Sequence, residues 1–393
     1  MKNIIKFTFL FLAYSFSFST FNYLVAQATM PATDHQGIIQ QLEKESTNSK
    51  QPKPIGQISD ALTIAGYLET YYSYDFANPE NHVRQPFIYA YNRHNEINLN
   101  LGYIKLSYSS ENVRSNISLM AGTYSNDNLS AEPGVLKNVY EANVGFKISN
   151  KKDIWIDAGI MPAHIGFESA VGKDCWVLTR SIMAENSPYY ETGARISYTT
   201  DSGKWFVSAL ILNGWQRIYR RDGNNSPAFG HQLTFKPNSK VTLNSSSFIG
   251  NDMPDSTKQM RYFHNLYGQF QITEQWALIA GFDIGVQQTA QHNSTYNTWY
   301  APILILKLSP TDKFSMAARA EYYSDENGTI IATQTPNNFQ TFGYSLNFDC
   351  LIHNNVWWRV EGRGFLSKDK IFSLNEKPNN NNNFLTTSIA ISF

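Results

Sequence analysis

The sequence predicts an all-β fold, namely a transmembrane antiparallel up-and-down β-barrel of about 16 strands with short periplasmic turns and long extracellular loops. Three observations predict it. Apolar and polar residues alternate along most of the chain, the connections alternate between short and long, and the last alternating segment ends on Phe393. A soluble β-sandwich also alternates, but nothing in its architecture sorts its loops by length.

The N-terminal segment, residues 1–28, is typical of a secretory signal peptide. A basic start is followed by an apolar stretch, and the segment ends in Ala26-Gln27-Ala28, which fits a cleavage site for signal peptidase. Residues 29–60 are polar, with Gln-rich and Lys/Pro-rich pieces. We interpret them as a flexible periplasmic segment ahead of an outer-membrane β-barrel at residues 61–393.

The predicted strands are segments in which the side-chain period is two. In one of them Leu278, Phe282 and Ile284 share one face, whereas Gly281 and Asp283 share the other. The segments identified in this way are 62–75, 96–108, 113–123, 139–148, 153–163, 190–199, 204–214, 228–236, 240–249, 261–272, 275–287, 297–308, 313–324, 339–350, 356–365 and 384–393.

The connections between these segments follow the rule for membrane barrels, in which short periplasmic turns alternate with long external loops. Short polar turns are expected at 109–112, 149–152, 200–203, 237–239, 273–274, 309–312 and 353–355. Longer polar segments are expected at 76–95, 124–138, 164–189, 216–226, 250–259, 288–296, 325–338 and 366–383. The alternation holds for every connection, and an even number of strands would put both chain ends in the periplasm.

The last segment is the strand that would close the sheet. An open edge in hydrocarbon leaves backbone N–H and C=O groups unpaired at several kcal/mol each, so the first and last strands must pair. Leu385, Ile389 and Phe393 face one way, and Thr386 and Ser388 face the other. The terminal aromatic residue resembles the signal read by the outer-membrane barrel-assembly machinery, which is therefore an expected partner through Phe393.

Composition and charge exclude several other classes of protein. The 32 basic residues balance the 32 acidic residues, so no global field favours nucleic acid. After the N-terminus no run approaches the ~20 apolar residues of a membrane helix. Cys175 and Cys350 lack a CxxC spacing and are expected to be free thiols. The acidic tip at 325–328 completes no calcium-loop signature, so we expect no metal and no cofactor.

Several short motifs resemble the outer-membrane family called putative β-barrel porin-2, or OmpL-like, from about Gly66 to Phe393. They are Ala158-Gly159-Ile160-Met161-Pro162-Ala163-His164-Ile165-Gly166-Phe167-Glu168-Ser169, Thr179-Arg180-Ser181 through Ser187-Pro188-Tyr189-Tyr190-Glu191-Thr192-Gly193, Asn213-Gly214-Trp215, and Arg319-Ala320-Glu321-Tyr322. The resemblance implies a barrel porin of largely undefined substrate. It supplies no established site residues and sharpens the expected fold more than the expected function.

A barrel of this size is wide enough for a water-filled lumen. The charged residues predicted to line it on the strands are Glu69, Glu141, Asp157, Arg195, Asp283, Arg319, Glu321, Arg359, Glu361 and Arg363. An equally weighted alternative is that these charges form salt bridges along the wall. The longest loop, 164–189, is expected to fold into the lumen as a constriction that presents Glu168, Lys173, Asp174, Arg180 and Glu185. The alternative for this loop is an external cap.

The leading functional prediction is an outer-membrane porin for passive diffusion of small hydrophilic solutes, without catalytic residues. The alternatives are a barrel-embedded hydrolase and a structural or adhesive barrel. His164, His231 and His264 are the candidate bases, but no GxSxG motif accompanies them, and His231 and His264 have outward parity. The expected surroundings are Gram-negative outer-membrane lipid and lipopolysaccharide. A homo-oligomer is expected by analogy alone, and the transported solute is not defined.

Overall fold

The computed structural model describes residues 57–59, 61–374 and 377–393. They belong to one compact unit, Pro52–Phe393. The signal peptide predicted at 1–28 and most of the predicted lead-in at 29–60 lie outside the described residues. Among the described residues, no helix combines the length and the apolar character needed to cross a membrane.

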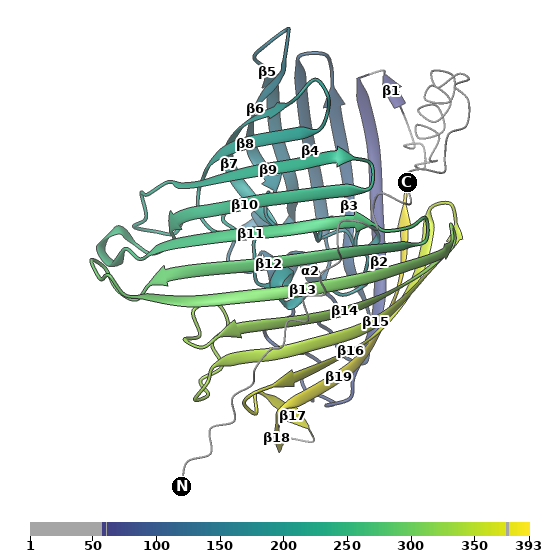
Figure 1. Cartoon of the computed structure of the whole chain (residues 1–393), viewed down its shortest axis with the longest axis vertical. Coiled ribbons are helices and arrows are strands. Elements are labelled where there is room, and N and C mark those ends of the chain that lie inside the picture. Colours follow the sequence, from purple (N-terminus) through teal and green to yellow (C-terminus); the bar gives the residue numbers. More distant parts are fainter. Residues whose placement is uncertain (1–56, 60, 375–376) are drawn as a thin grey trace, which may run out of the picture. The chain divides into compact units, whose positions relative to one another are not determined.

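The described residues form a closed antiparallel barrel of 16 strands, as the sequence predicts (Figure 1). Each strand pairs with the next along the chain, and the last strand pairs with the first, from Phe384 opposite Asp75 to Ser392 opposite Tyr67. The barrel strands are β2 (Leu62–Asp75), β3 (Ile97–Ser109), β4 (Val113–Ala121), β5 (Val139–Lys147), β6 (Asp153–Pro162), β7 (Tyr190–Thr199), β8 (Trp205–Leu212), β9 (Ala228–Asn238), β10 (Val241–Asn251), β11 (Met260–Gln271), β12 (Trp276–Gln288), β13 (Tyr296–Thr311), β14 (Phe314–Asp325), β15 (Phe339–His353), β16 (Val356–Ser367) and β19 (Asn381–Ser392).

The remaining elements are short. Strand β1 (Gln57–Ser59) pairs with the start of β2, so these three residues of the predicted lead-in are in a strand. A small hairpin in the last long loop pairs β17 (Phe372–Leu374) with β18 (Lys377–Asn379). The helical turns of the loops are α2 (Thr123–Asn128), η1 (Gly134–Asn138), η2 (Gly172–Asp174), α3 (Ile182–Glu185) and η3 (Asp255–Thr257).

The two faces of the sheet differ as the alternation predicts. In β8 the side chains of Val207 and Ile211 are exposed on the outside, whereas Ser208 and Leu210 are buried inside. An apolar outer band is the face that a membrane barrel presents to lipid. His231 lies on this outer face, where its ring contacts the hydroxyl group of Ser247 at 2.5 Å.

At the closing seam of the barrel, Gly66 lies directly against Phe393. Gly66 and Phe393 exchange two backbone hydrogen bonds, of 2.6 and 3.0 Å. A Cβ atom at position 66 would overlap the ring of Phe393, which packs directly on the glycine. The terminal aromatic side chain therefore covers the last pairing of the sheet.

Candidate functional site

The third loop, residues 163–189, folds into the barrel. At its start, His164 lies between the carboxylate of Glu191 and the backbone carbonyl of Ser247, with 2.8 Å to each. The hydroxyl of Ser246 donates to the carbonyl of His164 at 2.8 Å, and Asn265 accepts from the amide of Gly166 at 3.2 Å. These partners lie on β7, β10 and β11, so the loop crosses the interior directly after it leaves β6.

The middle of the third loop is fixed to the inner wall by three arginine residues. Arg359 donates to the carbonyl groups of Gly172 at 2.5 Å and Cys175 at 2.9 Å. Arg319 donates to the carbonyl of Thr179 at 2.8 Å, and Arg363 to that of Arg180 at 2.7 Å. Loop carbonyls that have no strand partner are thus satisfied by guanidinium groups of β14 and β16.

The same wall also accepts hydrogen bonds from the amides of the third loop. Glu361 accepts from the amide of Thr179 at 2.6 Å, and Glu321 from that of Ile182 at 2.7 Å. Asn347 accepts from the amide of Leu178 at 3.0 Å. The inner wall of the barrel therefore supplies hydrogen-bond donors for the carbonyl groups of the third loop and acceptors for its amides.

The charged residues among these anchors form one buried ion cluster. Arg319 lies 2.8 Å from Glu361, 3.3 Å from Glu321 and 3.9 Å from Glu168, and Arg363 pairs with Glu321. Each of these side chains is at most 3 % exposed. Buried charges are tolerated only when they are paired and hydrogen-bonded, which is the case here.

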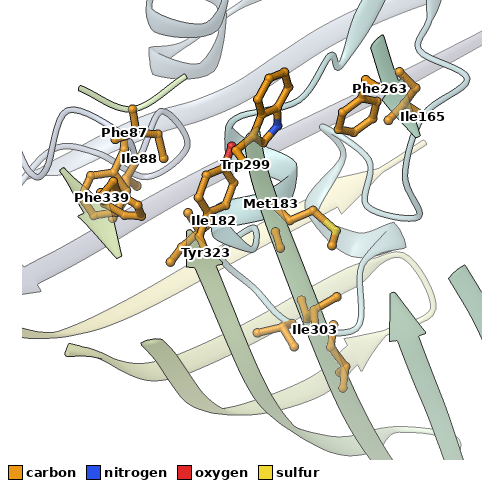
Figure 2. Packing of buried hydrophobic residues seen from close by; sticks show 14 of the residues in the cluster. Phe87, Ile88, Ile165, Ile182, Met183, Phe263, Trp299, Ile303, Tyr323 and Phe339 are labelled. Carbon is orange, nitrogen blue, oxygen red and sulfur yellow. The ribbon is translucent and has the colours of Figure 1, made fainter. Parts of the chain in front are cut away.

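An apolar plug lies next to this cluster in the barrel interior. We define the plug as Phe87 and Ile88 of the first loop (residues 76–96) with Val177, Ile182 and Met183 of the third loop. Figure 2 shows Phe87, Ile88, Ile182 and Met183 of these loops among inward side chains of the strands, which include Trp299, Tyr323 and Phe339. The ring of Phe87 lies 4.7 Å from that of Phe339 and 5.6 Å from that of Phe365.

The plug packs against apolar residues at inward positions of the strands. The alternation alone does not identify these positions, because their outward neighbours are apolar as well. The inward face of β13 carries Trp299, Ala301, Ile303 and Ile305, all of which are buried. Its outward face is also apolar, as Leu304 shows. A strand that is apolar on both faces is buried on both, by lipid outside and by a loop inside.

A carboxylate joins the first and third loops. Glu185 accepts hydrogen bonds from the backbone amides of Tyr89 at 3.1 Å and Ala90 at 3.3 Å. Burial raises the pKa of Glu185 from its ordinary value of 4.5 to about 7, against these hydrogen bonds and the attraction of Arg180 and Arg363. The contact between the loops is therefore expected to respond to pH near neutrality.

The contact is expected to weaken as pH rises. A carboxyl group whose pKa is raised on folding stabilises the folded form fully below its unfolded pKa, and this contribution is lost as pH rises through the folded pKa. After correction for the intrinsic rate, hydrogen exchange at the amides of Tyr89 and Ala90 should accelerate between about pH 5 and about pH 8. Glu185→Gln should abolish this dependence, and an unchanged profile in the variant would contradict the assignment.

Two cavities that are large enough for many water molecules remain at the end of the barrel where the short turns lie. A cavity of about 500 Å³ extends below the third loop along β13 to β16, and another of about 470 Å³ lies along β7 to β11. Within the loop layer, the voids beside Phe167 and beside Tyr124 measure about 10 Å³ each. A void of that size holds about one water molecule, so the loops are closely packed at these two places.

The structure places several of the predicted site residues directly against the third loop, namely Arg319, Glu321, Arg359, Glu361 and Arg363. The predicted residues that are buried, by whole residue or by side chain, are Glu69, Glu141, Asp157, Glu168, Arg180, Glu185, Asp283, Arg319, Glu321, Arg359, Glu361 and Arg363. Lys173, Asp174 and Arg195 keep 24 %, 49 % and 25 % of their side chains exposed. The equally weighted alternative, salt bridges along the wall, describes the pairing of Arg195 and Arg114 with Asp157.

Two further charged residues face the interior, and the parity of their strand positions could have identified them. Lys105 pairs with Glu141 at 2.5 Å, and Lys307 faces the larger cavity. Both occupy inward positions of their strands. The predicted free thiols are confirmed, because neither Cys175 nor Cys350 forms a disulfide. No group of three or more His, Cys, Asp or Glu side chains suited to a metal ion occurs within 57–59, 61–374 and 377–393.

The structure is a closed antiparallel barrel with an apolar outer band, and a loop folds across its partly aqueous interior. These features are those of the class of outer-membrane porins. The family model described as putative beta-barrel porin-2, OmpL-like, matches residues 61–393, and the chain belongs to this family. The porin predicted from the sequence is thereby confirmed. No significant relative is found among curated protein sequences.

Solved structures with a similar fold are outer-membrane proteins of low sequence identity. OmpT of Vibrio cholerae, in trimer form, is 11 % identical with a TM-score of 0.56 over 85 % of this chain and 100 % of its own. The anion-selective porin from Comamonas acidovorans is 8 % identical with a TM-score of 0.57 over 85 % and 99 %. The channel DcaP of Acinetobacter baumannii is 9 % identical with a TM-score of 0.54 over 84 % and 97 %. At these identities the similarity establishes the fold.

Proposed function

We propose that the protein is a porin of the Gram-negative cell outer membrane through which small hydrophilic solutes diffuse passively, and that the third loop constricts its lumen. The observation that supports this proposal best is the fixation of the loop across the interior, above two aqueous cavities. Glu168, Arg180 and Glu185, together with the strand residues of the ion cluster, shape the passage by holding the loop. Lys173, Asp174 and Arg195 meet the solute.

Conductance of the purified protein in planar bilayers tests this function. Stepwise, sustained conductance from protein whose gel mobility changes on boiling would support a porin, because a folded barrel resists detergent until it is heated. A folded barrel that stays silent at every applied voltage would contradict it. The geometry gives no support to the hydrolase alternative, since Glu191 and the Ser247 carbonyl occupy both nitrogens of His164 and His231 faces outwards.

The expected surroundings and partners belong to the same proposal. Residues 1–28 direct export as a cleaved signal peptide, residues 29–60 remain in the periplasm, and residues 61–393 insert into lipid and lipopolysaccharide. The barrel-assembly machinery recognises the last strand through Phe393, which packs at the closing seam. A homo-oligomer is part of the proposal because OmpT of Vibrio cholerae, of similar fold, has a trimer form.

A further inference from the structure

We propose that the larger interior cavity is a binding site for a small organic carboxylate whose apolar part is flat. This inference rests on the proposed function, because the lumen is the route by which such a solute would arrive. The cavity holds about 500 Å³, which exceeds what a single ion needs. Its lining combines a cation without a partner, an indole ring and hydroxyl groups.

The cation is the ammonium group of Lys307, on the inward face of β13. Lys307 is half-buried, and its nitrogen lies 5.7 Å from the ring centre of Trp176 in the third loop. Within the described part of the chain, this nitrogen has neither a hydrogen-bond nor an ion-pair partner. A partly desolvated ammonium group without a counter-ion is unfavourable, and a bound carboxylate would satisfy it.

The acidic residue that attracts Lys307 is already engaged. Asp349 accepts two hydrogen bonds from Arg359, of 2.6 and 3.0 Å, a third from Asn347 at 2.8 Å and a fourth from the hydroxyl of Ser315 at 3.4 Å. Among the described residues, it forms no ion pair with Lys307. Glu274 and Asp312, the other acidic residues of the lining, are exposed at the turns. The position beside Lys307 is therefore left for an anion from solution.

An aromatic residue in the cavity lining indicates that the ligand also has an apolar part. Trp357 of β16 lines the cavity, and the ammonium group of Lys173 lies 5.7 Å from its ring centre. Ser309 and Ser315 add hydroxyl groups. An indole surface in a cavity that is also lined by two ammonium groups, those of Lys173 and Lys307, suits a planar apolar group that carries one carboxylate. The second cavity has lysine residues, Lys204 and Lys236, but its lining contains no tryptophan.

Binding of benzoate to the purified full chain in detergent, followed by calorimetry and tryptophan fluorescence, tests the site. Benzamide, which has nearly the same shape and no charge, is the matched probe. We expect benzoate to bind at least about tenfold more tightly than benzamide, and Lys307→Met to weaken benzoate by about tenfold or more. Lys307→Arg should retain binding because it keeps the charge, and Lys236→Met in the other cavity should leave it unchanged.

Three results would overturn the inference: equal affinity for the two probes, benzoate affinity unaffected by Lys307→Met, or an equal loss in Lys236→Met, which would indicate general attraction by a basic lumen. Lys307→Arg keeps the test decisive if Lys307→Met does not fold, because a folded arginine variant without benzoate binding would also contradict the site. Failure of the proposed function would give a different experimental result from failure of the binding site. A silent bilayer together with intact, Lys307-dependent benzoate binding would remove the porin function and leave the site standing.

Discussion

Replacing Arg319 with methionine is expected to release the third loop from the inner wall and to raise single-channel conductance severalfold. Arg319 donates to Thr179 and pairs with Glu361, and its side chain is fully buried. Removing one partner of a buried ion pair costs about 3–5 kcal/mol, because the remaining carboxylate is left without compensation. Planar-bilayer recordings and limited proteolysis within residues 163–189 measure the two consequences.

Arg195→Met is the matched control for Arg319→Met. Arg195 also faces the interior, but its side chain is 25 % exposed and it shares Asp157 with Arg114. An ion pair in contact with water contributes about 1 kcal/mol or less, so the third loop should stay in place. Conductance that rises equally in both variants would show that the buried cluster does not hold the loop.

Phe87→Ala is expected to loosen the first loop from the plug, with a loss of about 3–5 kcal/mol in the stability of that packing. The side chain is 4 % exposed and its ring meets those of Phe339, Phe365 and Phe372. The residues around the void would lose their contacts with the phenyl ring. The loops cannot move in to fill the void without breaking the hydrogen bonds that hold them. Hydrogen exchange across residues 76–96 and the frequency of channel opening should both increase.

Phe76→Ala provides the comparison within the same loop. Phe76 is 58 % exposed, and the aromatic ring beside it is that of Tyr74, at 5.4 Å. Its removal should leave hydrogen exchange in the loop and conductance nearly unchanged. If Phe87→Ala behaves like Phe76→Ala, the apolar plug does not fix the first loop.

The strands and their faces could be predicted from the sequence because the signal is local. The alternation of Leu278, Phe282 and Ile284 with Gly281 and Asp283 is a property of neighbouring residues, and it places β12 and its inward side whatever the rest of the chain does. Closure followed from the cost of an open edge in lipid, and the structure pairs β19 with β2 accordingly. The length and polarity of residues 164–189 also predicted an unusual third loop.

The partners of the inward charges could not be predicted in this way. The amide of Thr179 donates to the carboxylate of Glu361, although the two residues are separated by 182 positions in the chain. Which strand lies opposite a given loop residue depends on how the barrel closes and on the path of the loop. Parity therefore identified Arg319, Glu361 and Arg363 as inward, but left open whether they line water or form salt bridges along the wall, and it did not indicate that they bind the third loop.

By itself, the sequence determined a closed β-barrel, its strands and the residues on each face, because a period of two and a closed sheet leave few other solutions. The tertiary structure decided that the interior charges bind a loop, that an apolar plug packs in the barrel interior, and that Lys307 faces a cavity without a counter-ion among the described residues. The physical reason is that burial and pairing of polar groups depend on contacts between segments far apart in the chain, which local alternation does not encode.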